Sequence, residues 1–225
     1  ALVEGEAVRL VVVGVVGRGV PDVGPQDEQR GPIGLLRSFE GGFERVGVVR
    51  DLAEFDDLLD KFSLHVRNVL DAPDILAVQE VENLNVLQSL AARINSDDPA
   101  ISYSAFLEEG NDVGGIDVGF LTRDDTIVVD AVTQVGANVL LTFDGSLLND
   151  RPPLILDARY VGGGADFPLT VIGVHQRSLS GIEDPGSGGT RVKTKRFEQA
   201  EFLAGVIQDL QTLDPSIHLV VTGDF

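Results

Sequence analysis

Cysteine is absent from this 225-residue chain, and basic residues are few. Without cysteine the chain can form neither a disulfide framework nor a thiolate metal site. Lysine and arginine number 17 against 36 aspartate and glutamate residues, which gives a formal net charge of −19. A chain of that charge repels polyanions at long range, which disfavours a broad basic face for nucleic acid. An acidic surface suits a protein that gathers divalent cations, a protein in high salt, or simply a well-solvated surface.

Long apolar runs are absent as well. The longest occupies residues 10–16, far short of the roughly 20 residues that a membrane helix needs, so no membrane span is expected. This run lacks the layout of a signal peptide, and the chain begins with Ala1, so we expect a processed or excised piece of a longer product. Hydrophobic residues make up 43% of the chain, which at this length is enough to bury one substantial core.

The chain divides into two parts of different composition. Residues 1–44 hold a strand candidate at 8–16 and a stretch rich in glycine, proline and charge at 17–34. We interpret them as an N-terminal extension or a divergent first strand region. Residues 45–225 carry regular hydrophobic patterns throughout, and we assign them to one domain.

Hydrophobic periodicity predicts three helices and a series of short strands in this domain. Apolar residues recur at helical spacing over 53–70, 84–94 and 203–213. Strand patterns occupy 74–79, 103–107, 117–122, 127–135, 154–160, 169–175 and 218–222. Many strands with few helices between them predict an α+β fold of paired sheets that carry helices outside, not a doubly wound parallel sheet.

An acidic motif, QEVEN at 79–83, follows the strand at 74–79. A carboxylate at the point where a strand leaves the core points into a crevice, where it can hold a hard cation through oxygen. Glu80 is therefore a candidate metal ligand. The alternative is that Glu80 or Glu82 begins the next helix, where acidic residues favour the helix dipole.

Two further charged residues lie beside predicted strands. Asp117 is flanked by apolar strand residues, so if buried it must be paired or hydrogen-bonded, and a turn at the strand start would meet that need. Arg151 precedes a strand that two prolines stiffen. The guanidinium is a natural fork for phosphate, although a surface salt bridge is the commoner role of such an arginine.

His175 and Asp224 share a feature with Glu80, because each follows an apolar strand. His175 is the best placed of the three histidines to act as a general acid or base near neutral pH, with a satisfied core histidine as the alternative. The ends of adjacent strands converge at one rim of a sheet. The pattern predicts that these three side chains form an acid–metal–imidazole site there.

Five segments, in this order, resemble the endonuclease/exonuclease/phosphatase superfamily, whose fold is deoxyribonuclease I-like, and are most similar to its bacterial extracellular-nuclease branch. They are APDILAVQEVEN at 72–83, GIDVGFL at 115–121, LNDRPPL at 148–154, the strand ending in HQRSL at 175–179, and GDF at 223–225. The resemblance implies a two-layer β-sandwich flanked by helices that is incomplete at the C-terminus.

The resemblance also implies roles for the candidate residues. Glu80 would bind Mg²⁺, or Mn²⁺ or Ca²⁺ in its place, and His175 would be the catalytic histidine near the scissile phosphate. Asp117 would orient His175, and Arg151 would contact a substrate phosphate. Asp224 would position the attacking water or a metal. The implied reaction is in-line hydrolysis of a phosphodiester, most simply in DNA or RNA.

The chain departs from the family pattern at both ends. The first strand of the family carries an Asn that helps to hold the metal, and the nearest residue here is Glu40, a weak second ligand. In the family, a functional Asn follows the residues that match Asp224 and Phe225, but the given sequence ends at Phe225. A later Asp-His pair of the family is absent as well. We therefore expect these 225 residues alone to be weakly active or inactive.

Alternatives differ in substrate and in class. A phosphodiesterase acting on a lipid or a small phosphate ester would carry the same motifs, and a degenerate domain could bind without catalysing. The only dense basic cluster is Arg191, Lys193, Lys195 and Arg196, which is either a strip for a polyanion or a solvated helix segment. An extracellular or cell-surface bacterial location is expected from the resemblance, and no protein partner is predicted.

Overall fold

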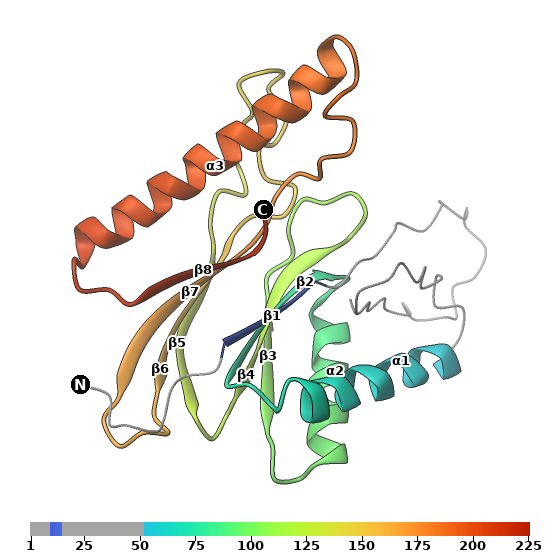
Figure 1. Cartoon of the computed structure of the whole chain (residues 1–225), viewed down its shortest axis with the longest axis vertical. Helices are drawn as coiled ribbons and strands as arrows, with labels where there is room; N and C mark the ends of the chain where they lie inside the picture. The colour runs from blue at the N-terminus through green and yellow to red at the C-terminus, as the bar shows by residue number, and fades with distance from the viewer. Residues whose placement is uncertain (1–9, 15–51) are drawn as a thin grey trace.

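Two β-sheets stacked face to face, with helices on their outer faces, form the body of the protein (Figure 1). The computed structural model describes residues 10–14 and 52–225. Glu40 and the boundary expected at residue 44 lie outside these described residues, so both stay predictions. The α+β two-layer sandwich flanked by helices, which the strand pattern predicted, is confirmed.

The elements follow one another in chain order: β1 (Leu10–Gly14), α1 (Leu52–Leu64), the π-helical turn η1 (His65–Val69), β2 (Ile75–Val81), α2 (Leu84–Asp97), β3 (Tyr103–Leu107), β4 (Asp117–Arg123), β5 (Ile127–Gln134), β6 (Leu154–Tyr160), β7 (Phe167–His175), α3 (Ser187–Leu213) and β8 (Leu219–Asp224). Each predicted strand is present, within two residues at either end. The helix predicted over 53–70 is an α-helix that ends in a π-helical turn.

Each sheet has four strands among the described residues. The first runs β1-β2-β4-β3 and the second β5-β6-β7-β8. Neighbouring strands are antiparallel except for two pairs, β1 with β2 and β7 with β8, which are parallel. Parallel pairing brings the C-terminal ends of β7 and β8 together, with His175 opposite Asp224 in the register.

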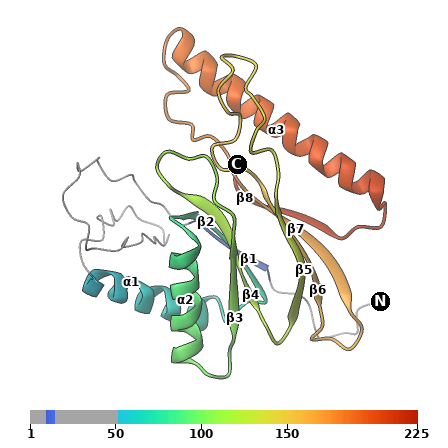
Figure 2. The same cartoon turned by 180° about the vertical axis from the view of Figure 1, so that it is seen from behind.

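Three apolar layers follow from the alternation of side chains along the strands. The layer between the sheets includes Ala77, Phe120 and Val171. Helices α1 and α2 cover the outer face of the first sheet over a second layer. Helix α3 covers the outer face of the second sheet, and the view from behind shows it crossing the far side of the sandwich from α1 and α2 (Figure 2). No helix of the described residues is long and apolar enough to cross a membrane.

Helix α3 starts at Ser187, well before the apolar repeat at 203–213 that predicted it. The helix continues because its N-terminal half is held by polar contacts with the 136–151 segment. Lys195 is only 2% exposed, and its Nζ donates to both carboxylate oxygens of Asp150 at 2.8 and 2.7 Å. The side-chain amide of Gln199 donates to the carbonyl of Leu148 at 3.0 Å and accepts from the amide of Arg177 at 2.9 Å.

Removing Asp150 is expected to lower the free energy of unfolding more than removing its partner Lys195. Asp150→Ala leaves a buried ammonium without its anion and should lower the free energy of unfolding by about 3 to 5 kcal/mol. Lys195→Met should cost less, because the Asp150 side chain is 33% exposed and its carboxylate can meet water. Urea unfolding of both variants measures the difference, and equal losses would contradict this account of the pair.

Candidate active site

Three strand ends bring Glu80, His175 and Asp224 together at one rim of the sandwich. The Nε2 atom of His175 lies 3.6 Å from Oε1 of Glu80 and 3.7 Å from Oδ2 of Asp224. Glu80 comes from the first sheet and the other two residues from the second, so the site bridges the two layers. This juxtaposition is the one that the sequence predicted for these three residues.

A β-bulge turns Glu80 toward the histidine. The register between β2 and β4 shifts between Gln79 and Val81, so Glu80 is the extra residue of the bulge. Its backbone has φ 60°, in the left-handed region that non-glycine residues seldom adopt. Backbone strain of this kind costs of order 1 to 3 kcal/mol and concentrates at functional sites. The bulge takes Glu80 out of the strand's two-residue alternation and aims its carboxylate at Nε2.

His175 is buried and neutral at physiological pH. Burial in the sandwich, aided by the nearby Arg151 cation, lowers the pKa of His175 to about 4. Its Nε2 faces the two carboxylates, whereas Nδ1 is buried and has no hydrogen-bond partner in the described part of the chain. A neutral imidazole can accept a proton, and the two nearby carboxylates would favour the imidazolium against the burial that opposes it.

Asp224 is the exposed member of the site. Its side chain is 69% exposed, against 14% for Glu80 and 6% for His175. The backbone around it is held to β7, because the amide of Gln176 donates to the carbonyl of Asp224 at 2.8 Å. Asp224 therefore presents its carboxylate to solvent from a fixed position next to the imidazole.

Asp117 is buried nearby but does not contact the histidine through a hydrogen bond within the described ranges. Its Oδ1 accepts from the amide of Gly110 at 2.7 Å. Burial, with repulsion from Glu109 and Asp112, raises the pKa of Asp117 to about 6, against the opposing effects of that hydrogen bond and of Arg151. The structure thus shows Asp117 hydrogen-bonded to the backbone of Gly110, and its orienting role toward His175 stays a prediction.

The raised pKa of Asp117 makes its contribution to stability depend on pH. The folded state holds the Asp117 proton up to about pH 6 and the unfolded state only to about pH 4, so stability falls as pH rises through this window. Asp117→Asn is uncharged throughout and keeps the acceptor for Gly110. Its unfolding free energy relative to wild type should therefore rise by about 1 to 2 kcal/mol between pH 4 and 7.

Urea titrations at several pH values measure this difference. Asp209→Asn, on the exposed side of α3, controls for the loss of one negative charge. A difference between Asp117→Asn and wild type that stays constant from pH 4 to 7 would contradict the assignment.

Arg151 reaches the site from behind and is occupied by protein groups. Its Nε donates to the carbonyl of His175 at 3.3 Å and its Nη2 to the carbonyl of Gln176 at 2.9 Å. Its Nη1 forms an ion pair with Oδ1 of Asp112 at 3.1 Å. The sequence did not single out Asp112, whose only signal was its place in the glycine-rich turn NDVGG at 111–115. The contact of Arg151 with a phosphate stays a prediction.

The donor set at the rim matches a hard cation in kind. Mg²⁺ in proteins is commonly held by one or two carboxylates, with waters and substrate phosphates completing its shell. Glu80 and Asp224 supply two carboxylates on either side of His175. Over residues 10–14 and 52–225, no group of three or more histidine, aspartate or glutamate side chains is arranged to hold a metal ion. A cation bound by the two carboxylates would therefore take the rest of its shell from water and substrate.

The basic cluster on α3 is engaged by protein groups at three of its four positions. Lys195 pairs with Asp150, Arg191 with Asp144, and Arg196 donates to the carbonyl of Arg177. These contacts engage three of the four charges with protein groups, so the cluster does not form a free strip for a polyanion.

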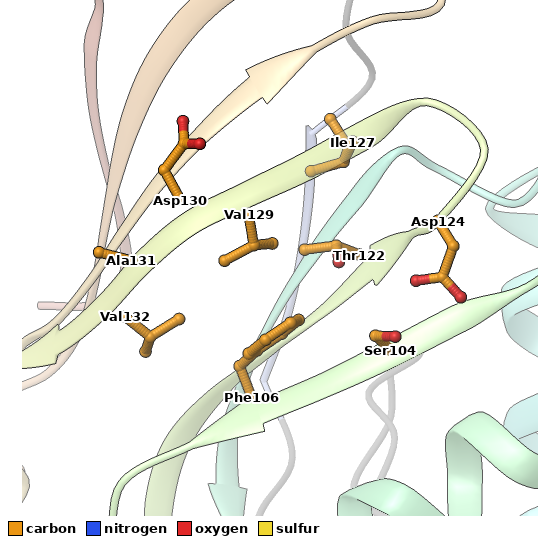
Figure 3. A pocket seen from close by; sticks show the side chains of 9 residues that line it. All are labelled: Ser104, Phe106, Thr122, Asp124, Ile127, Val129, Asp130, Ala131 and Val132. Carbon is orange, nitrogen blue, oxygen red and sulfur yellow. The ribbon is translucent and has the colours of Figure 1, made fainter.

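A cavity of about 460 Å³ lies away from these strand ends, between the edge strands β3 and β5 (Figure 3). Apolar side chains line it, including Phe106 and Val129, together with Ser104, Thr122 and Asp124. None of the predicted site residues borders it. This cavity and the cluster of titratable groups are therefore different places on the molecule.

No protein-family description and no curated protein sequence matches the chain. Solved structures that resemble it include a humanized D. rerio TDP2 with 14 mutations, at 20% sequence identity and a TM-score of 0.48. The match covers 77% of this chain and 60% of that one. The human Nocturnin catalytic domain with a bound sulfate anion matches at 17% identity and a TM-score of 0.46, over 73% of this chain and 55% of its own.

A mannosyl-6-phosphatase of Bacteroides thetaiotaomicron matches at 15% identity and a TM-score of 0.48, over 75% of this chain and 56% of its own. The chain thus spans less than two thirds of the length of each of these structures.

Proposed function

We propose that this protein is a metal-dependent phosphodiester hydrolase of the endonuclease/exonuclease/phosphatase superfamily, acting on DNA or RNA. The observation that carries the proposal is the convergence of Glu80, His175 and Asp224. These are the three residues that the motif resemblance picks out as metal ligand, catalytic histidine and water-positioning acid, and they lie within 4 Å of one imidazole nitrogen.

The side chains divide the work of in-line hydrolysis. Asp224, exposed and fixed by β7, orients a water toward the phosphorus atom. His175 is neutral at pH 7 and accepts the proton that the water loses as it attacks. The departing ester oxygen, on the opposite side of the phosphorus, takes its proton from solvent when the P–O bond breaks, and the imidazolium of His175 then returns its proton to solvent. A cation held by Glu80 and Asp224 would supply charge stabilisation at the phosphoryl oxygens.

The experiment that tests the proposal is hydrolysis of plasmid DNA and of bis-p-nitrophenyl phosphate by the full-length protein, with Mg²⁺ and with EDTA, because these 225 residues alone are expected to be weakly active or inactive. We expect cleavage of both with Mg²⁺ and none with EDTA. Glu80→Gln, which keeps the shape of the side chain but weakens its binding of a cation, should need a higher Mg²⁺ concentration for the same rate. Metal-independent cleavage would contradict the metal-dependent mechanism, and no cleavage of either substrate would contradict the proposal and favour a non-catalytic binding domain.

A small phosphodiester, such as a lipid headgroup or a sugar phosphate, is the second candidate substrate. The observation that favours it is the engagement of Arg191, Lys195 and Arg196 by protein groups, in a chain of net charge −19. Binding of a polynucleotide should weaken steeply as salt rises, because condensed counterions are released from the phosphates. Cleavage of only the small diester, with little dependence on salt, would select this candidate.

A further inference from the structure

Three consecutive side chains at 149–151 each hold a different part of the fold. The Asn149 amide donates to the carbonyl of Gly136 at 3.1 Å, and Asp150 binds the buried Lys195 of α3. Arg151 holds the end of β7. Because Asn149 and Asp150 anchor the backbone on one side and Pro152 stiffens it on the other, the position of the Arg151 side chain is closely defined.

The Arg151 guanidinium spans the last residue of β7 and the first residue beyond it. Two of its nitrogens donate to the consecutive carbonyls of His175 and Gln176. The side chain is 10% exposed, and the cavity beside it and His175 holds only about 10 Å³. A planar guanidinium with these two acceptors fixes both peptide planes, whereas a single-point donor could fix one.

Asp112 sets the plane of this guanidinium from the other side. One carboxylate oxygen pairs with Nη1 of Arg151, and the other accepts from the amide of Gly114 at 2.8 Å. The Asp112 side chain is 15% exposed, so the pair is shielded and its geometry is worth more than that of a surface ion pair. The neighbouring Asn111 ties the same turn to the 137–150 segment through the carbonyls of Ala137 and Asn149.

We propose that Arg151 is a positioning residue that fixes the imidazole of His175 through the backbone of β7, and that Asp112 orients the guanidinium for this task. The inference rests on the proposed function and assigns Arg151 a role other than a phosphate contact. The same peptides join β7 to β8, because the Gln176 amide donates to the carbonyl of Asp224. Arg151 therefore holds the backbone segments that carry the side chains of His175 and Asp224.

The test compares Arg151→Met and Arg151→Lys with a matched control, Arg159→Met. Arg159 is also an arginine in ion pairs with two carboxylates, those of Asp130 and Asp166, but it lies on the exposed face of β6. The first readout is the set of ring ¹⁵N and ring-proton NMR signals of His175 at pH 7.5 in the metal-free protein, assigned by their loss in His175→Gln. This readout needs no turnover.

We expect the His175 ring signals to move in Arg151→Met, to move less in Arg151→Lys, and to stay in place in Arg159→Met. Asp112→Asn, which keeps an acceptor but loses the charge, should move them in the same direction by a smaller amount. Adding Asp112→Asn to Arg151→Met should then produce no further shift, since both changes act through one guanidinium. Unchanged His175 signals in a folded Arg151→Met or Asp112→Asn protein would overturn the proposal.

Two kinetic and binding readouts separate positioning from phosphate contact. With bis-p-nitrophenyl phosphate, Arg151→Met should lower kcat by about 10²-fold with KM changed less than about twofold, since a misplacement near 1 Å costs about that much. Affinity for inorganic phosphate, followed by titration, should stay unchanged. A raised KM together with weakened phosphate binding would assign Arg151 to the phosphate instead. If the full-length wild-type protein hydrolyses nothing, the proposed function fails, and the NMR shifts alone decide the positioning role.

Discussion

Replacing His175 by glutamine is expected to lower kcat for phosphodiester hydrolysis by about 10³-fold or more. General acid–base catalysis by a positioned imidazole contributes typically 10² to 10⁴ in rate, and glutamine can donate and accept hydrogen bonds but cannot carry the proton. The measurement is the steady-state rate with bis-p-nitrophenyl phosphate and Mg²⁺. His218→Gln is the control, since His218 is an exposed histidine that packs on Phe167, 4.2 Å between ring centroids, and has no part in the site.

The stability of the same variant tests the burial of the imidazole. The folded state holds the pKa of His175 at about 4, below the ordinary value of 6.5, so between these pH values only the unfolded state takes up the proton. Wild type therefore loses stability as pH falls through this window, by up to about 3 kcal/mol, and His175→Gln should be spared that loss. The change of stability with pH that His175 causes is opposite in sign to the change that Asp117 causes. Relative to wild type, the free energy of unfolding of His175→Gln should therefore rise as pH falls, whereas that of Asp117→Asn should rise as pH rises.

Two results would contradict this picture of His175. One is a rate that falls less than about tenfold in His175→Gln at pH 7.5, which would remove the imidazole from the chemistry. The other is a difference in unfolding free energy from wild type that does not vary between pH 4 and 6.5. The first result bears on the proposed function and the second on the burial of the ring, so the two can be judged separately.

Gly223→Ala is expected to lower the free energy of unfolding by about 3 kcal/mol or more and to displace Asp224. Gly223 has φ 137°, a conformation that L side chains rarely adopt. A Cβ built there would lie 1.9 Å from the carbonyl oxygen of Val174, its register partner on β7. The Val174 oxygen belongs to the backbone, and the backbone of residue 223 fixes the place of the Cβ, so the clash can be relieved only by moving β8 away from β7.

Urea unfolding measures the loss, and the hydrolysis assay should show the displacement of Asp224 as a lower rate. Gly205→Ala is the matched control, because Gly205 lies within α3 and a Cβ there meets nothing within 4 Å. That substitution should stabilise the protein by about 0.5 to 1 kcal/mol, since alanine loses less backbone freedom in a helix. Equal stabilities of Gly223→Ala and wild type would show that the strand end accepts a side chain.

The helices and strands of this protein could be predicted from its sequence to a large extent. Apolar spacing is a local property, and burial of one face against a sheet or helix enforces it residue by residue. The strand at 103–107 and the strand at 154–160 have the bounds that the pattern predicted. The pattern failed for the first half of α3, because that half is held by Lys195 and Gln199 through polar contacts with the 136–151 segment, which leave no apolar repeat.

The candidate site was predictable where it depended on strand ends. Glu80, His175 and Asp224 each follow an apolar run, and the structure brings all three to one rim. The bulge that aims Glu80 was not predictable, because it depends on the register of β2 against β4, some 40 residues further along the chain. The partner of a polar strand residue is likewise set by pairing between distant segments.

The sequence by itself determined which segments become helices and strands and which polar residues stand at their ends, since both follow from local apolar periodicity. Tertiary structure alone decided what those residues contact. Arg151 could have met solvent, a phosphate or protein, and the fold places it against His175, Gln176 and Asp112. Asp117 could have been exposed, and its burial raises its pKa to about 6. Contacts and dielectric surroundings arise from residues far apart in the chain, so no local pattern encodes them.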